Sequence, residues 1–151
     1  KQATEIAIKI AEKLNIVGIL AVELFVTKDG KVLVNEIAPR PHNSGHQTIE
    51  GNITSQYEQM LRAITNLPLG ETTITKPAVM VNILGEKGYE GSAIYSGLED
   101  ILKKDGVHVH LYGKKITKPF RKMGHVTVTS NTLAEAIEKA NYIKNTLKVI
   151  A

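Results

Sequence analysis

The sequence predicts an α/β protein, more closely an α+β protein, whose sheet is largely antiparallel. Three segments repeat apolar residues at helical spacing, and several shorter segments are rich in β-branched residues. Two of the strand-like segments are separated only by the turn signal Lys28-Asp29-Gly30-Lys31, which predicts a hairpin. We expect two domains, residues 1–67 and residues 68–151, divided in the loop that follows Leu67.

The first domain is expected to consist of a helix, a hairpin and a second helix. Apolar residues at helical spacing predict the first helix over residues 3–14, and residues 18–27 and 32–38 are the two predicted strands. Ser55 and Glu58 have the spacing of a capping box at the start of the second helix. Its apolar stripe is Tyr57, Met60, Leu61 and Ile64.

The second domain is expected to be richer in strands. Strands are predicted over residues 78–84, 107–112 and 125–129, and a short helix over residues 98–104. Residues 85–97 contain too much glycine for an assignment. Thr132 and Glu135 predict the cap of a final helix. The apolar stripe expected on that helix is Leu133, Ile137, Ala140, Ile143 and Leu147.

Composition restricts the class of protein. A hydrophobic content of 42% and a charged content of 23% are typical of a soluble globular protein, and no apolar run is long enough to span a membrane. We expect the protein in the cytoplasm, with which a sequence without cysteine is compatible. The absence of cysteine excludes disulfides and thiolate metal sites. The sequence opens on Lys1 rather than Met, which indicates a fragment, a processed chain or a shortened one.

Glu23 and Glu36 are the most informative pair of residues. If Asp29-Gly30 is the two-residue loop of a type I′ turn, Phe25 pairs with Val34 and Glu23 with Glu36. The hairpin is apolar on both faces, so we expect both faces to be buried. Two facing carboxylates there need a cation or a shared proton, and Mg²⁺ prefers such oxygen ligands. The alternatives are two solvated glutamates and a carboxylate pair for acid–base catalysis.

The loop that follows the hairpin contains polar groups that suit an anion. It runs ArgProHisAsnSerGlyHis from Arg40 to His46. The Arg40 guanidinium suits phosphate or carboxylate, and Asn43 and Ser44 can donate to an anion. The histidines, among them His42, can donate, accept or carry a proton, but without a third ligand their spacing does not indicate zinc. The alternative is a polar loop that closes on its own backbone.

A basic segment occupies residues 107–125, which contain no acidic residue. Its cations could attract a phosphorylated metabolite or nucleic acid, or simply be solvated. Aromatic content is 5% and no nucleic-acid motif is present, so nucleic acid is not the expected partner. The cations are Lys114, Lys115, Lys118, Arg121 and Lys122.

Several of these stretches closely resemble carboxyaminoimidazole ribonucleotide synthases, the ATPase subunits of phosphoribosylaminoimidazole carboxylase, which belong to the ATP-grasp superfamily. The resemblance is carried by AVELFVTKDGKVLVNEIAPRPHNSGHQTIEG at residues 21–51, and by ITSQYEQMLRAITNLPLG, PAVMVNILGE and YGKKITKPFRKMGHVTV further along. It implies that residues 1–67 are the C-terminal part of an ATP-grasp domain. Residues 68–151 would be a small β-rich domain like the rudiment single hybrid motif.

The resemblance also implies an activity and roles for individual residues. ATP would phosphorylate bicarbonate, and the amine of aminoimidazole ribonucleotide would capture the carboxyl group. Glu23 and Glu36 would hold Mg²⁺, and Asn35 with Glu36 would form the pair that contacts ATP. Arg40, Asn43 and Ser44 would lie at the reacting groups. The residues implied for substrate binding are His42, Lys114, Arg121 and Lys122.

The family's N-terminal half is not in this sequence, so we expect the 151 residues alone not to turn over ATP. Relatives of this kind are often homodimers, and we expect the same here. Two other functions stay open. One is a formate-dependent phosphoribosylglycinamide formyltransferase or another ATP-grasp ligase, because the formyltransferase has a similar stretch at residues 39–45. The other is a non-catalytic module that binds anions through residues 107–125.

Overall fold

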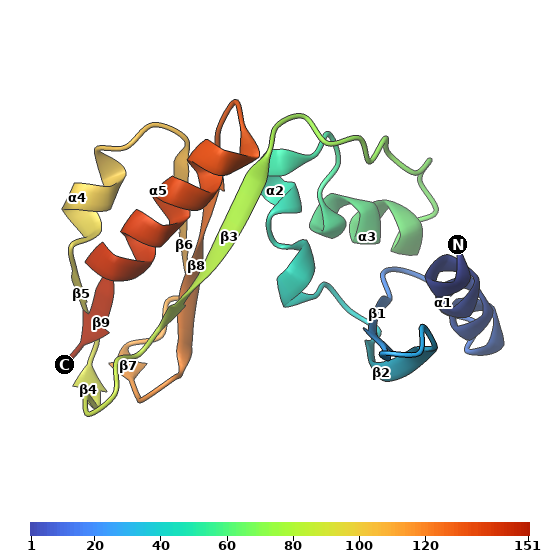
Figure 1. Cartoon of the computed structure of the whole chain (residues 1–151), viewed down its shortest axis with the longest axis horizontal. Coiled ribbons are helices and arrows are strands. Elements are labelled where there is room, and N and C mark those ends of the chain that lie inside the picture. Colours follow the sequence, from blue (N-terminus) through green and yellow to red (C-terminus); the bar gives the residue numbers. More distant parts are fainter. The chain divides into compact units, whose positions relative to one another are not determined.

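The computed structural model describes residues 1–151, which form two compact units (Figure 1). Unit 1 comprises residues 1–49 and 53–73, and unit 2 comprises residues 50–52 and 74–151. Every strand pair is antiparallel, which confirms the predicted fold class. None of the helices combines the length and the apolar character that crossing a membrane would require.

Unit 1 contains the expected helix, hairpin and second helix. Ser55 Oγ accepts a hydrogen bond from the Glu58 backbone N–H at 3.2 Å and so caps the second helix, as its spacing predicted. The short helix α2 (Thr48–Gly51), which the sequence did not reveal, is shared by the two units. The other elements of unit 1 are α1 (Gln2–Lys13), β1 (Ala21–Val26), β2 (Val32–Ala38), η1 (Asn43–Gly45) and α3 (Gln56–Ile64).

The turn of the hairpin differs from the prediction. Thr27 N–H donates to Lys31 O, and Gly30 N–H donates to Thr27 O, both at 2.9 Å, so the loop has three residues instead of two. Gly30 has φ +81°, the left-handed conformation that such a loop requires. Phe25 therefore pairs with Leu33, and the predicted pairing with Val34 is wrong.

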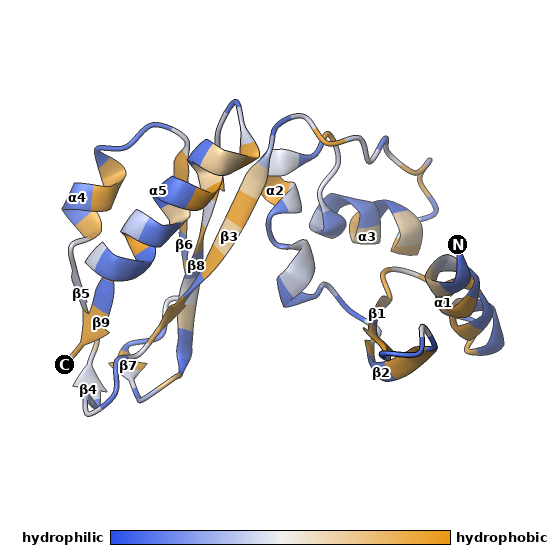
Figure 2. Ribbon diagram, in the orientation of Figure 1, coloured by the Kyte–Doolittle hydropathy of each residue, from blue (hydrophilic) through white to orange (hydrophobic).

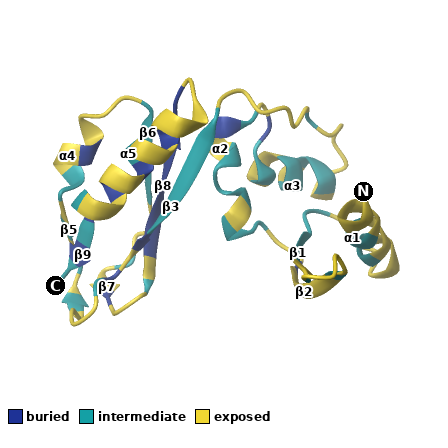
Figure 3. Cartoon of the chain, viewed as in Figure 1, coloured by how far each residue is buried: buried dark blue, intermediate teal, exposed yellow.

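The hairpin is also more exposed than its composition predicted. Figure 2 shows hydrophobic residues on both of its strands, and Figure 3 shows much of β2 exposed. Phe25 is 58% exposed and Val26 is 74% exposed, so the expectation of two buried faces is wrong for this chain. The reason is that β1 and β2 pair only with each other, and a two-stranded sheet has no further layer to cover it.

Unit 2 is built around a three-stranded sheet in the order β3-β8-β6. Helix α5 packs along β3 and β8, with α4 beside it (Figure 1). The apolar core lies between these helices and the sheet, and includes Ile101, Val126 and Ile143. The elements are β3 (Ala78–Leu84), β4 (Gly91–Ser92), β5 (Ile94–Ser96), α4 (Leu98–Leu102), β6 (Val107–Leu111), β7 (Ile116–Thr117), β8 (Lys122–Thr129), α5 (Leu133–Thr146) and β9 (Lys148–Ile150).

The final helix is capped as predicted and buries the C-terminal part of its predicted stripe. Thr132 Oγ1 accepts from the Glu135 N–H at 3.3 Å. Leu133 and Ile137, which the predicted stripe placed inside, are 55% and 46% exposed. Ala140, Ile143 and Leu147 of the stripe are buried as predicted, and Ala136, which the stripe did not include, is buried as well. Small alanine side chains allow a helix to lie close to a sheet, which a count of large apolar residues does not reveal.

Candidate metal and anion sites

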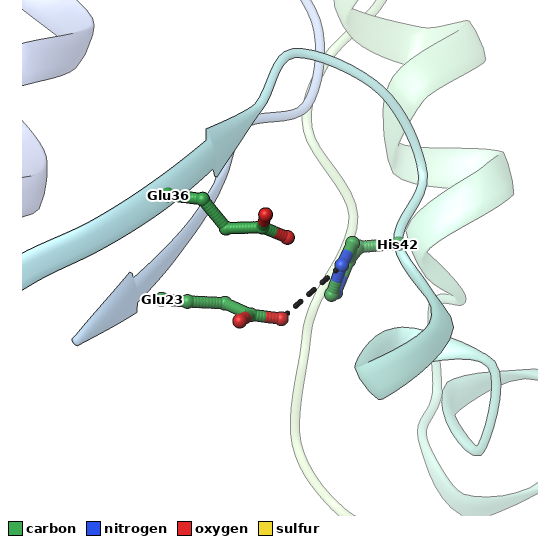
Figure 4. A group of neighbouring side chains, drawn as sticks. All are labelled: Glu23, Glu36 and His42. Carbon is green, nitrogen blue, oxygen red and sulfur yellow. Dashed lines mark ion pairs between the residues drawn. The ribbon is translucent and has the colours of Figure 1, made fainter. Parts of the chain in front are cut away.

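Glu23 and Glu36 face each other across the hairpin, as the sequence predicted. The register between β1 and β2 changes between Glu23 and Leu24, and this bulge makes Glu36 the partner of Glu23. Figure 4 shows both carboxylates directed toward the ring of His42. One ligand atom from each of the three residues lies within 4.8 Å of the others, so together they could hold a metal ion.

The neighbours of this cluster orient its ligands. Asn35 Nδ2 donates to Glu23 Oε2 at 3.3 Å, and His42 Nε2 lies 3.4 Å from Glu23 Oε1. His42 is held from its other side, because its Nδ1 lies 2.9 Å from Ser44 Oγ. The Glu23 side chain is 43% exposed and that of His42 only 14%. A cation there would keep contact with water on one side and lie against a fixed imidazole on the other.

Gln56, which the sequence analysis did not single out, fixes the loop that contains His42. The His42 N–H donates to Gln56 Oε1, and Gln56 Nε2 donates to His42 O, each at 2.9 Å. The same Nε2 lies 2.9 Å from His46 Nδ1. A β-carbon on Gly45 would overlap Gln56 Oε1, so a larger residue there would displace the Gln56 side chain. No local pattern marks Gln56, because its role depends on where α3 meets the loop.

The remaining predicted residues of the loop lie around the same turn. Asn43 and Ser44 form η1 directly after His42, and His46 stacks on Tyr57 with ring centroids 5.8 Å apart. Arg40 Nη1 donates to Pro41 O at 3.1 Å, which leaves most of its donors for a ligand. The loop therefore has a fixed backbone, and its Arg40 guanidinium forms no ion pair with an acidic residue.

The predicted phosphate residues Lys114, Arg121 and Lys122 belong to unit 2. Lys114 Nζ donates to Lys122 O at 2.7 Å, and Arg121 Nη1 donates to Ile116 O at 3.0 Å. Neither cation forms an ion pair, whereas Lys118 in the same connection pairs with Glu90 at 3.4 Å. Main-chain carbonyls hold Lys114 and Arg121 without neutralising them, which suits an anionic ligand.

A second polar group in unit 2 was also missed. Four side chains lie in successive contact. They are Glu50 in α2, His110 on β6, His125 on β8 and Tyr112 directly after β6. The alternation in Val107-His108-Val109-His110 was a signal for a strand, but the pairing of His110 with His125 is long-range. Local spacing could not have revealed it.

Models of two families match the chain in succession. The model described as "ATP-grasp domain" matches residues 1–57, and the one described as "Phosphoribosylaminoimidazole carboxylase C-terminal domain" matches residues 78–139. A crystal structure of N5-carboxyaminoimidazole ribonucleotide synthetase from Thermotoga maritima is 56% identical with a TM-score of 0.92. That match covers 99% of this chain and 41% of the other.

Two further relatives agree with this result. The N5-carboxyaminoimidazole ribonucleotide synthase of Aquifex aeolicus is 48% identical over 148 residues, which are 98% of this chain and 39% of that protein. The Aspergillus clavatus synthase in complex with ADP and 5-aminoimidazole ribonucleotide is 38% identical, with a TM-score of 0.73. That match covers 85% of this chain and 34% of the Aspergillus chain.

The fold and the paired carboxylates thus define the chain as part of an ATP-grasp protein. It spans about two fifths of the length of the relatives it matches. The chain belongs to the family of N5-carboxyaminoimidazole ribonucleotide synthases, as its motifs predicted.

Proposed function

We propose that the chain is the part of an ATP-dependent ligase that holds Mg²⁺ and contributes to binding of 5-aminoimidazole ribonucleotide, in the carboxylation step of purine biosynthesis. The facing pair Glu23 and Glu36 carries the proposal, because the two carboxylates lie close enough to share one cation and offer the oxygen ligands that Mg²⁺ prefers. The names of the relatives support the substrate, and the complex with ADP and the ribonucleotide supports both ligands. Residues 1–67 would end the ATP-grasp domain, and residues 68–151 would form the small domain that follows.

The proposed reaction has two steps. A bicarbonate oxygen attacks the γ-phosphorus of ATP, the bond to the β-phosphate oxygen breaks, and ADP leaves. The amine nitrogen of the ribonucleotide then attacks the carboxyl carbon of carboxyphosphate and loses a proton, while the C–O bond to phosphate breaks. Mg²⁺, when bound, supplies charge neutralisation of the transferred phosphoryl group.

The residues of unit 1 would position the reacting groups. Glu23 and Glu36 provide the hard oxygen ligands that Mg²⁺ prefers, and their exposure leaves room for water and phosphate oxygens. The imidazole of His42 is a poorer ligand for Mg²⁺ than an oxygen atom. We therefore assign His42 to orienting the Glu23 carboxylate and to contacting the substrate. Asn35 would orient Glu23 and, with Glu36, contact ATP. Arg40, Asn43 and Ser44 would contact bicarbonate and the developing carboxyphosphate.

The residues of unit 2 would bind the 5′-phosphate of the ribonucleotide. Arg121 can make a bidentate contact, and the Lys114 ammonium has two donors left after its bond to Lys122 O. The Lys122 side chain, at the start of β8, would add a further positive charge. The lack of ion pairs at Lys114 and Arg121 supports this assignment.

The proposed activity requires an N-terminal part like that of the relatives, which are more than twice as long. We call the protein with that part the completed protein. The exposed apolar hairpin supports such a partner, since Phe25 and Val26 would then be covered. We further propose that the completed protein is a homodimer of the cytoplasm, and its composition without cysteine is compatible with a reducing compartment.

Product analysis with the completed protein tests the proposal. Carboxylated aminoimidazole ribonucleotide and ADP should form only when ATP, bicarbonate and the ribonucleotide are all present. The 151-residue chain alone should release no ADP. Formylated glycinamide ribonucleotide with formate would instead support the formyltransferase. Salt-sensitive binding to nucleic acid without any turnover would support a non-catalytic anion-binding module.

A further inference from the structure

Four polar side chains of unit 2 make a continuous series of contacts on one side of its main sheet. His110 Nε2 lies 2.7 Å from Glu50 Oε1, and the His110 ring stacks on His125 with centroids 4.5 Å apart. His125 Nδ1 in turn lies 3.0 Å from the Tyr112 hydroxyl. Glu50 belongs to the three-residue segment that the contacts assign to unit 2, so the whole series lies within one unit.

The strands place these residues together. His110 and His125 are register partners on the neighbouring strands β6 and β8, so their rings leave the sheet on the same face. Tyr112 lies two residues beyond His110, on the same face, where its hydroxyl reaches diagonally to His125. Helix α5 packs on Val126 and Val128, which lie on the other face. The polar series therefore lies on the face of the sheet opposite the apolar core.

Burial makes the contacts of this series strong. His125 is 2% exposed, and the Glu50 side chain is 13% exposed. A buried imidazole or carboxylate is costly unless a partner satisfies it, so each contact restrains both groups.

The series ends at the ammonium group of Lys114. Lys114 Nζ lies 5.8 Å from the centre of the Tyr112 ring, as in a cation–π contact, and donates to Lys122 O at 2.7 Å. Lys122 opens β8, three residues before His125. The Tyr112 ring is therefore fixed at its hydroxyl end and limits where the Lys114 side chain can lie. A flexible lysine otherwise loses much rotamer freedom when it binds a ligand.

We propose that Tyr112 and His125, braced by His110 and Glu50, are positioning residues that hold Lys114 ready for a phosphate monoester. The inference rests on the proposed function for the identity of the ligand, the 5′-phosphate of a ribonucleotide. These residues do not touch the ligand. They preorganise the Lys114 ammonium, which would contact the phosphate. Their loss should therefore weaken binding of the phosphate and leave binding of ATP unchanged.

Tyr112→Phe in the completed protein is the primary test. It keeps the ring beside Lys114 but removes the hydroxyl that contacts His125, so the strand and the core should be preserved. We expect the KM for the ribonucleotide to rise about twofold to tenfold, the effect of one hydrogen bond. The KM for ATP and kcat at saturating substrate should not change. Tyr112→Leu, which also removes the ring, should have a larger effect of the same kind.

A matched pair of histidine variants separates positioning from a general loss of stability. His110→Gln removes the ring that stacks on His125. His108→Gln changes the exposed histidine two residues earlier on the same strand. Only His110→Gln should raise the KM for the ribonucleotide. Equal effects of the two variants, or a rise in the KM for ATP that matches the rise for the ribonucleotide, would overturn the proposal.

Inorganic phosphate, titrated into wild type and Tyr112→Phe, separates this inference from the proposed function. If wild type binds phosphate more tightly than the variant but neither binds the ribonucleotide, the proposed function fails and the positioning role stands. If the ribonucleotide and phosphate bind both proteins equally, the proposed function stands and the positioning role is wrong. Binding of neither ligand to wild type would overturn both.

Discussion

Glu23 and Glu36 are register partners although the turn between them, and the pairing next to that turn, differ from those expected from the sequence. The three-residue loop shifts the pairing near the turn by one residue, and the bulge beside Leu24 shifts it back. The bulge also brings Asn35 within 3.3 Å of Glu23. The irregular hairpin thus has a direct consequence for the site, because it aligns two carboxylates and an amide on one face.

Replacing either glutamate by glutamine should abolish most Mg²⁺-dependent turnover in the completed protein. The substitution keeps the shape of the side chain but removes a negative ligand, so we expect at least about a tenfold fall in kcat and weaker Mg²⁺ binding by calorimetry. Glu12→Gln, on the exposed surface of α1, is the control. Wild-type rates of ATP hydrolysis in Glu36→Gln would show that the pair does not hold the metal.

The hairpin also shows what local sequence can and cannot predict. Alternation and the Asp29-Gly30 signal were sufficient for the two strands and for the hairpin that joins them. The loop length and the bulge were not predictable, because the Asp29-Gly30 signal is compatible with loops of two or three residues and no local pattern marks the bulge. The two errors cancelled at Glu23, so the pair was correct while the predicted partner of Phe25 was wrong.

Long-range pairing limited the predictions for the second unit in another way. The strands of β3, β6 and β8 were recognisable from their β-branched residues, but β7 and β9 are too short to give a pattern. The contact of His110 with His125 depends on the register of two strands that are adjacent only in the folded sheet. Periodicity likewise could not show that Ala136, rather than Leu133 and Ile137, faces the core.

The turn of the hairpin should respond to acid through Asp29. The hydrogen bond from the Lys31 ammonium, followed by that from the Thr27 hydroxyl, lowers the Asp29 pKa below 3.8. A carboxylate with a lowered pKa stabilises the folded turn above pH 3.8, and this contribution is lost as pH falls through the lowered value. An NMR titration should show the Asp29 midpoint below 3.8 in wild type and closer to 3.8 in Lys31→Gln. Identical midpoints would refute the role of Lys31.

Gln56 and Gln59 provide a matched pair of variants on one helix. Gln56 forms two hydrogen bonds with the backbone of His42, and Gln59 forms two with the backbone of Gly70. Each alanine substitution should lower the free energy of unfolding by about 1–3 kcal/mol, because it leaves partly buried backbone groups without partners. Chemical denaturation measures this loss.

Only the first of these variants should impair catalysis. Gln56→Ala releases the loop that contains His42, Asn43 and Ser44, so kcat should fall in addition to stability. Gln59→Ala loosens a loop that carries no proposed site residue, and kcat should be unchanged at a temperature where the protein is folded. Equal losses of kcat would mean that stability alone accounts for the effect.

Arg121→Ala should weaken binding of the ribonucleotide and spare ATP. Arg121 lies in an acid-free basic segment, forms no ion pair and donates to Ile116 O, so most of its donors remain for the 5′-phosphate. A charge-assisted hydrogen bond contributes about 1.5–3 kcal/mol, so the KM for the ribonucleotide should rise roughly tenfold to a hundredfold. Lys118→Ala is the matched control, because this lysine lies in the same connection but pairs with Glu90. Both Michaelis constants are measured in the completed protein. A higher KM for ATP with an unchanged KM for the ribonucleotide would assign Arg121 to the nucleotide triphosphate instead.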